Sequence, residues 1–179
     1  MDRILILHSS VDGHTVKICE RLKTLIEARG DAVTLCPIAD SADPQAFDKI
    51  VIGASIRYGK HRPAVSEFVE RHRLVLARKP VAFFSVNIVA RKPQKNRPET
   101  NPYVIKFLRQ SRWQPDLTGV FAGKLDYPSY GFIDRLMIRF IMLMTKGPTD
   151  PSTVVEFTDW TSVEAFAKAL CELAKPAGA

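Results

Sequence analysis

A short hydroxyl-rich loop near the start of the chain has the residue types that bind a phosphate group. It joins an apolar segment, residues 3–8, to an amphipathic segment, residues 15–29, and it contains Ser9, Ser10, Asp12, Gly13, His14 and Thr15. A strand-to-helix loop leaves backbone N–H groups free at the helix N-terminus, where an anion is favoured. Gly13 also lets the backbone approach a ligand closely. The loop is neither a Walker A loop nor a Gly-x-Gly-x-x-Gly motif, and a turn that binds no ligand is the alternative interpretation.

Positive charge is a second candidate feature, because it is concentrated in two segments. The chain has 26 Lys and Arg against 19 Asp and Glu, a net charge of +7. The net positive charge of residues 57–62 and 85–112 together exceeds that of the whole chain, so the remainder of the chain has a small net negative charge. Such local basicity predicts an anionic partner. The alternative is that these side chains only keep exposed loops soluble.

Alternating segments of two periodicities predict the elements that position these residues. Apolar runs predict strands over 3–8, 32–37, 49–55, 81–86 and 119–125, and amphipathic segments predict helices over 15–29, 63–76, 102–111 and 161–174. This alternation predicts a doubly wound α/β fold with a parallel sheet, in a single domain of residues 1–179. Ligands of such sheets bind beyond the carboxyl ends of the strands. We therefore expect the loops 8–15, 54–62 and 86–102 to meet at one edge.

Cysteine usage and hydropathy narrow the class of protein. Cys19, Cys36 and Cys171 lie far apart and form no pattern with histidines, so we expect neither a metal site nor a disulfide. A reducing compartment fits this pattern. Met1 leads directly into the first strand, and no apolar run approaches the ~20 residues of a membrane span. We expect an intracellular protein that is soluble or lies on a membrane surface.

Residues 126–152 interrupt the pattern, and we interpret them as an insertion. Residues 132–144 predict a helix with Asp134, Arg135 and Arg139 on one arc. The opposite half is apolar and includes Leu136, Met137, Phe140, Ile141 and Met144. Residues 154–157 then predict another short strand, as if the fifth strand had been interrupted.

Three interpretations of this apolar helix face compete. It packs on its own domain, it forms a contact with a second copy of the chain, or it lies in a membrane interface where it meets a quinone. Nearby cations and the tyrosines Tyr127 and Tyr130 are typical of a helix at an anionic membrane surface.

Three further strings make a family resemblance specific. They are Val-Ile-Gly-Ala-Ser-Ile-Arg-Tyr-Gly at 51–59, Ser-Val-Asn-Ile-Val-Ala-Arg-Lys-Pro at 85–93, and Asp159-Trp160. With the phosphate-binding candidate and the insertion, they resemble the flavodoxin-type, menaquinone-dependent protoporphyrinogen oxidase (dehydrogenase) family, in register from residue 3 to about 174. The resemblance implies a flavodoxin-like, five-stranded parallel sheet of order 2-1-3-4-5 with a long-chain-type insertion in the last strand.

The resemblance also implies FMN as cofactor and assigns residues to it. The phosphate would be bound by Ser9, Ser10, Asp12, Gly13, His14 and Thr15. The flavin ring would be flanked by one loop with Ser55, Ile56, Arg57, Tyr58 and Gly59, and by a second with Asn87, Ile88, Val89 and Ala90. Tyr58 is the one obvious aromatic residue in the first loop, and the second offers none before Ala90.

The implied activity is the oxidation of protoporphyrinogen IX to protoporphyrin IX in haem biosynthesis, with menaquinone or another quinone as acceptor. Candidates for binding the substrate propionates are Arg57, Arg62, Arg91, Lys92, Lys95 and Arg97. Leu136, Met137, Phe140, Ile141 and Met144 are candidates for membrane or quinone contact. The intrinsic pKa of histidine suits a general base. Of His61 and His14, His61 is a weak candidate for this role. The implied location is cytoplasmic, peripheral on the inner face of the cell membrane.

Other functions remain open at this point. An NAD(P)H:quinone reductase or FMN electron carrier could use the same fold, although the chain shows no separate dinucleotide fingerprint. A non-enzymatic protein could place its basic loops on anionic lipid or nucleic acid. Because few aromatic residues, Tyr103 among them, are interleaved with the second basic segment, nucleic acid is not expected as a partner. Self-association remains possible.

Overall fold

The central sheet has five parallel strands. The structure is a computed structural model that describes residues 1–174, so the last five residues of the predicted domain 1–179 lie outside the described range. The strands follow the order β2-β1-β3-β5-β6, with bounds β1 (Arg3–Ser9), β2 (Ala32–Pro37), β3 (Lys49–Arg57), β5 (Val81–Val86) and β6 (Leu117–Phe121). The predicted order is confirmed. A two-residue strand that was not predicted, β4 (Lys60–His61), pairs antiparallel with the end of β3.

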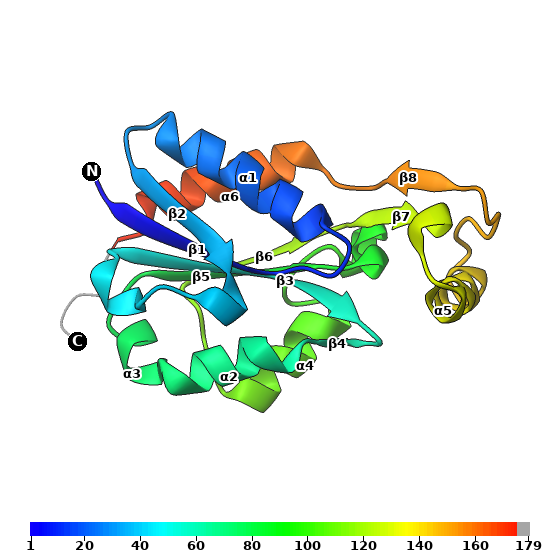
Figure 1. The fold of residues 1–179 in the computed structure, drawn as a ribbon, viewed down its shortest axis with the longest axis horizontal. Helices are drawn as coiled ribbons and strands as arrows, with labels where there is room; N and C mark the ends of the chain where they lie inside the picture. Colours follow the sequence, from blue (N-terminus) through cyan, green and yellow to red (C-terminus); the bar gives the residue numbers. More distant parts are fainter. Residues whose placement is uncertain (175–179) are drawn as a thin grey trace.

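Helices cover both faces of this sheet (Figure 1). One layer holds α1 (His14–Glu27) and α6 (Trp160–Glu172), and the other holds α2 (Pro63–Arg71), α3 (Arg73–Leu76) and α4 (Pro102–Ser111). The predicted helix over 63–76 is broken into two at His72, whose ψ of 18° leaves the helical range. Alternate residues of β1 enter the two cores: Leu5 and Leu7 pack under α2, while Ile4 and Ile6 pack under α1 and α6.

The parallel register places the loops after β1, β3 and β5 next to one another. Ser9 at the end of β1 pairs with Ala54, and the next residue, Ser55, pairs with Val86 at the end of β5. The chain segments that follow these pairs are the three loops expected to carry the site.

The last strand ends earlier than predicted, and the insertion follows it. The sequence predicted one strand over 119–125, but the ladder between β5 and β6 ends at Val86 and Phe121. β7 (Lys124–Asp126) lies outside the central sheet. It pairs antiparallel with β8 (Val154–Glu156) in a separate two-stranded sheet. Residues 154–157 therefore do not resume the fifth strand. Backbone groups that leave one ladder must find partners elsewhere, and the returning chain supplies them.

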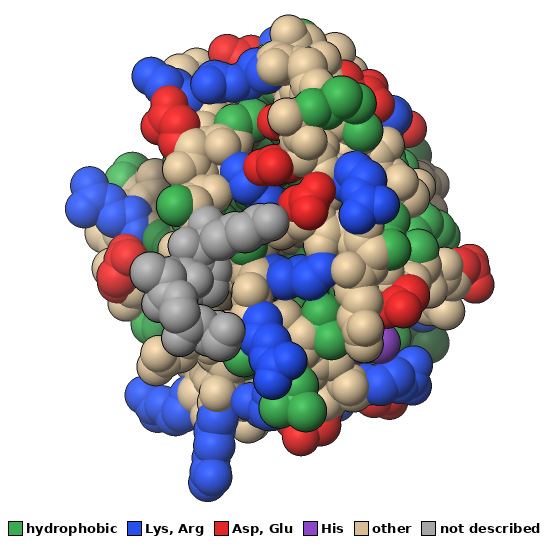
Figure 2. Space-filling view, turned by 90° about the vertical axis from the view of Figure 1, so that its left-hand side faces the viewer, with side chains coloured by type: hydrophobic (Ala, Val, Ile, Leu, Met, Phe, Trp, Pro, Cys, Tyr) green, Lys and Arg blue, Asp and Glu red, His purple; other side chains and the backbone are tan. Residues whose placement is uncertain are grey.

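The helix of the insertion, α5 (Phe132–Met144), has the predicted bounds and stands apart from both helical layers. It lies beyond the carboxyl ends of the strands, at the end of the molecule remote from the N-terminus (Figure 1). The opposite end carries Lys and Arg side chains intermixed with Asp and Glu (Figure 2). Within residues 1–174, no helix has the length and apolar character needed to cross a membrane.

His61 is part of the core beneath α4. Its side chain packs edge-on against Phe83 and Phe107, and its Nε2 lies 3.0 Å from the Ser85 hydroxyl. Burial lowers the pKa of His61 from 6.5 to about 4, because the imidazolium would lose its hydration. The imidazole is therefore neutral at pH 7.

We predict that His61 makes folding sensitive to mild acid. Below pH 6.5 the unfolded state binds a proton that the folded state binds only near pH 4, so the free energy of unfolding falls as the pH drops between these values. The loss attributable to His61 is about 3 kcal/mol. Urea unfolding from pH 7.5 to 4 checks this. His61→Gln, which can keep the contact with Ser85, should have a flatter profile, and a profile parallel to that of the wild type would contradict the assignment.

Candidate active site at the carboxyl edge of the sheet

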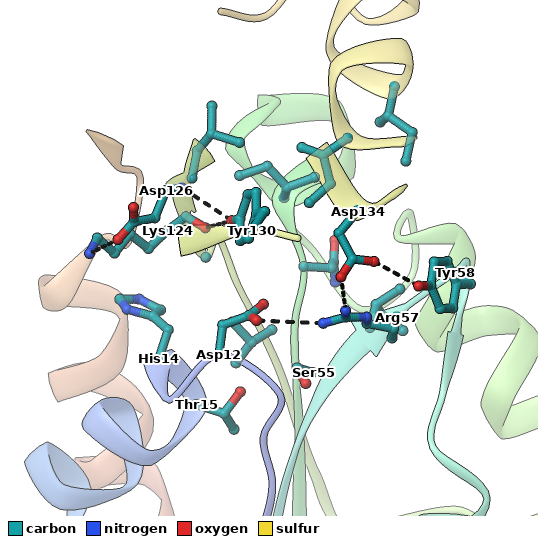
Figure 3. A pocket seen from close by; sticks show the side chains of 18 of the residues that line it. Asp12, His14, Thr15, Ser55, Arg57, Tyr58, Lys124, Asp126, Tyr130 and Asp134 are labelled. Carbon is teal, nitrogen blue, oxygen red and sulfur yellow. Dashed lines mark hydrogen bonds and ion pairs between the residues drawn. The ribbon is translucent and has the colours of Figure 1, made fainter. Parts of the chain in front are cut away.

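A cavity of about 300 Å³ lies where the three loops meet α5 (Figure 3). The loop after β1 and the start of α1 contribute Ser10, Asp12, His14 and Thr15, and the end of β3 with the turn after it contributes all five predicted residues, Ser55 to Gly59. From the third loop, Asn87 and Ile88 line the cavity. A cavity of this size is typical of a small-molecule site.

The first loop has the geometry of an anion site. Gly13 has φ +79° and precedes α1, which has no side-chain cap at its N-terminus. The Gly13 N–H donates to the Ser10 hydroxyl at 3.0 Å. Among the described residues, the Thr15 hydroxyl is the one buried side-chain polar atom without a hydrogen-bond partner. A buried donor without a partner is rare, and at a helix N-terminus it fits a phosphate group.

His14 is fixed in one tautomer. Its Nε2 lies 2.6 Å from the Thr158 hydroxyl, which itself donates to the Ala122 carbonyl at 2.8 Å. Because the single hydroxyl proton of Thr158 is used there, His14 Nε2–H is the donor in this contact. Burial, as the largest cause, lowers the pKa of His14. The ring is therefore neutral at pH 7 and ties α1 to the segment before α6.

The second loop turns back through two residues with positive φ, Tyr58 at +50° and Gly59 at +76°. The turn directs Arg57 and Tyr58 toward α5 (Figure 3). The Arg57 guanidinium pairs with the Asp134 carboxylate and lies 3.5 Å from the Asp12 carboxylate, and the Tyr58 hydroxyl donates to Asp134 at 2.6 Å. A loop of the sheet edge is thereby joined to the first turn of α5.

The third loop is held by a buried amide network. Asn87 Nδ2 donates to the Ser85 hydroxyl, and its Oδ1 accepts from the Ala90 N–H and from Asn101 Nδ2, the last at 3.0 Å. Val89 and Ala90 are buried behind the loop and do not line the cavity.

Arg91 at the end of this turn joins the third loop to the other end of α5. Its guanidinium donates to the Ile88 carbonyl, and to the carbonyl and hydroxyl oxygens of Thr145, the hydroxyl at 2.7 Å. Arg91 therefore holds the C-terminal end of α5, as Arg57 holds its first turn.

Asp134 and Arg135 on the polar arc of α5 are turned toward the protein, while Arg139 is exposed. Arg135 donates to the carbonyls of Tyr127 and Tyr130, and Arg139 donates to the carbonyl of Thr149. The apolar face points outward, and Phe140 and Leu143 are 60% and 70% exposed. The exposed side chains include Phe132, Ile133, Leu136, Met137, Phe140, Leu143 and Met144. Since Met142 is the one fully buried residue of the helix, α5 does not pack this face on its own domain.

Some predicted site residues lie outside the cavity lining. Of the six candidate cations only Arg57 lines it, while Arg62, Arg91, Lys92, Lys95 and Arg97 do not. Ser9 is buried, and its carbonyl accepts from the Ser55 hydroxyl. Gly13 and His61 are also absent from the lining. In the insertion, Met137 and Ile141 line the cavity, while Leu136, Phe140 and Met144 do not. Across residues 1–174 no group of His, Cys, Asp or Glu is arranged to bind a metal.

Other lining residues were not predicted. They are Val86, Tyr103, Gly123, Lys124, Leu125, Asp126, Ser129, Tyr130, Asp134 and Ile138. Most lie in or just before the insertion. For Asp134 the sequence signal was the charged arc of the helix.

Comparisons with known proteins agree with this fold. Residues 5–152 match the family model described as a flavodoxin domain. The protein named protoporphyrinogen IX dehydrogenase (quinone) of Escherichia coli K12 is 44% identical over 173 residues, 96% of each chain. A Leishmania major protein of the same name is 42% identical over 170 residues, 92% of this chain and 73% of that protein.

Solved structures show the fold. A flavodoxin from the domain Archaea has a TM-score of 0.56 at 14% identity, covering 95% of this chain and 96% of that chain. Flavodoxin 2 of Bacillus cereus has a TM-score of 0.53 at 19% identity, covering 95% and 98%. The family match over most of the chain and the identity above 40% together establish the assignment: this chain belongs to the flavodoxin-domain family and, within it, groups with the protoporphyrinogen IX dehydrogenases (quinone).

Proposed function

We propose that this chain uses FMN to oxidise protoporphyrinogen IX to protoporphyrin IX and passes the electrons to a quinone. The relatives in Escherichia coli and Leishmania major carry the name of this activity. The observation that carries the proposal is the second wall of the cavity, where α5 places Met137, Ile138 and Ile141 opposite the loops. An apolar wall beside a cofactor site suits a flat tetrapyrrole, which ordinary electron carriers have no need to bind.

FMN fits the donor groups at the sheet edge. Its phosphate would be bound by the loop Ser9, Ser10, Asp12, Gly13, His14 and Thr15, where the Thr15 hydroxyl has no partner within the described chain. The ring would lie between Ser55, Ile56, Arg57, Tyr58 and Gly59 and the loop Asn87, Ile88, Val89 and Ala90. When bound, FMN supplies the hydride acceptor. The protein supplies position: the network around Asn87 fixes one loop, and His14 fixes the start of α1.

The substrate would bind between these loops and α5. Arg57 is the predicted propionate ligand that lines the cavity, and a guanidinium matches a carboxylate in shape and charge. Arg62, Arg91, Lys92, Lys95 and Arg97 lie outside the lining, and Arg91 already donates to Thr145. His61 is not proposed as a general base, because it is buried beneath α4 away from the cavity.

The outward face of α5 supports a membrane-bound location. Leu136, Phe140 and Met144 are exposed, and contiguous exposed apolar residues mark a contact surface. Arg139 and Lys146 lie near them and suit anionic headgroups. We infer that α5 rests on the cytoplasmic face of the cell membrane, where Met137 and Ile141 lie between the bilayer and the cavity that a menaquinone would enter. A second copy of the chain on this face is the alternative.

We predict that Thr15→Val weakens FMN binding about tenfold, the effect of losing one hydrogen bond to a charged group. Quenching of flavin fluorescence by the apoprotein gives the dissociation constant. Thr24→Val is the matched control, because the Thr24 hydroxyl lies on the same helix and bonds to the Glu20 carbonyl. Equal affinity for FMN in Thr15→Val and Thr24→Val would show that Thr15 does not bind the phosphate.

Anaerobic turnover tests the proposed function itself. FMN-loaded protein is mixed with protoporphyrinogen IX, with menaquinone added or withheld, and porphyrin fluorescence is followed. We expect fluorescence to grow only when both protein and quinone are present. If FMN is bound but no quinone-dependent porphyrin forms, the proposal fails, and a quinone reductase or an electron carrier on this fold takes its place.

A further inference from the structure

The cations of the cavity are already neutralised by carboxylates of the protein. Among the described lining residues these cations are Arg57 and Lys124. Arg57 pairs with Asp134 and Asp12, and Lys124 pairs with Asp126 at 2.6 Å. Three carboxylates thus face two cations, which leaves an excess of negative charge where a substrate with two carboxylates is expected to bind.

The acidic groups around Arg57 affect the pKa of Asp12. Burial, as the largest cause, raises the pKa of Asp12, Arg57 opposes this rise, and the charge of Asp134 adds to it. A third carboxylate could not join Arg57 while both aspartates remain there, because like charges at such distances repel. One of the two must leave when an anionic ligand arrives.

Asp134 is the carboxylate that pairs most closely with Arg57, while Asp12 lies 3.5 Å away, so an incoming carboxylate must displace Asp134 to take the close position on the guanidinium. Its partners are Arg57 at the end of β3 and Tyr58 in the turn that follows, and Tyr58 is 61% exposed with φ +50°. The side chains of Arg57 and Asp134 are 28% and 19% exposed, so water reaches this ion pair and screens it in part. The remaining contacts of α5 lie further along it, through Arg135, Arg139 and the bond between Arg91 and Thr145. The first turn can therefore separate from the loop while the C-terminal end of the helix stays attached.

We propose that Asp134 occupies the place of a substrate carboxylate on Arg57, and that a propionate of the tetrapyrrole displaces it and frees the first turn of α5. The exchange replaces one carboxylate by another on the same guanidinium, so the Arg57 charge stays paired throughout. Asp134 is then a specificity-determining residue: a ligand without a carboxylate cannot compensate for breaking its contacts. This inference rests on the proposed function, because it takes a tetrapyrrole with propionates as the ligand.

Binding of the product tests the inference without turnover. Protoporphyrin IX and its dimethyl ester are titrated into FMN-loaded protein, and the Soret band gives both dissociation constants. In Asp134→Asn the preference for the acid over the ester should rise about five- to tenfold, because Arg57 no longer has a competing carboxylate. In Arg57→Gln the preference should largely disappear. Glu164→Gln is the matched control, since it removes one negative charge from a surface pair with Arg21.

Two results would overturn the inference. An unchanged or smaller preference for the acid in Asp134→Asn would mean that Asp134 only orients Arg57. Hydrogen exchange gives the second readout: protoporphyrin IX should speed exchange of the amides of residues 135–138 in the wild type, and no increase there would exclude displacement. If these binding results hold but anaerobic turnover is absent, the proposed function fails and the role of Asp134 stands. If turnover occurs but Asp134→Asn leaves the preference for the acid unchanged, the proposed function stands and the role of Asp134 fails.

Discussion

The ion pair between Arg57 and Asp134 decides how the insertion sits on the domain. A partly buried guanidinium needs a carboxylate partner, and the first turn of α5 supplies it. Arg135 turns the same way, toward backbone carbonyls of the insertion, while Arg139 stays exposed and donates to the Thr149 carbonyl. With Asp134 and Arg135 turned inward, the apolar side chains on the opposite side of the helix, Leu136, Phe140 and Leu143 among them, face out. The exposed apolar face is therefore a consequence of satisfied charges, and it is unfavourable in water unless something covers it.

The position of α5 also determines one wall of the candidate active site. A flavodoxin-like sheet edge supplies an anion site at α1 and two loops for a flavin, and α5 adds a wall with Met137, Ile138 and Ile141. The cavity has less positive charge than the net charge of the whole chain suggests. Arg91 donates a hydrogen bond to Thr145 outside the cavity lining. Lys and Arg side chains also lie at the opposite end of the molecule (Figure 2). The charge that matters for a ligand is that of Arg57 and its two aspartates.

Sequence reasoning predicted the features that depend on local pattern. The alternation of strands and helices, the turn at Gly13 before the first helix and the bounds of α5 follow from periodicity and turn residues, while the order of the sheet was implied by the family resemblance. Periodicity divides a helix into two faces, but it does not say which face contacts the protein. The inward position of Asp134 depends on Arg57, 77 residues earlier. The burial of His61 and the pairing of β7 with β8 are likewise long-range outcomes.

We propose that the outward apolar face of α5 lies on a bilayer, and partitioning onto vesicles tests this proposal. FMN-loaded wild type, Phe140→Asp and Leu74→Asp are sedimented with vesicles that contain phosphatidylglycerol. Leu74 on α3 is the control, because it is also an exposed apolar residue but lies far from α5. We expect the wild type and Leu74→Asp to sediment alike, and Phe140→Asp to bind several-fold less while retaining FMN. Equal sedimentation of Phe140→Asp and the wild type would contradict it.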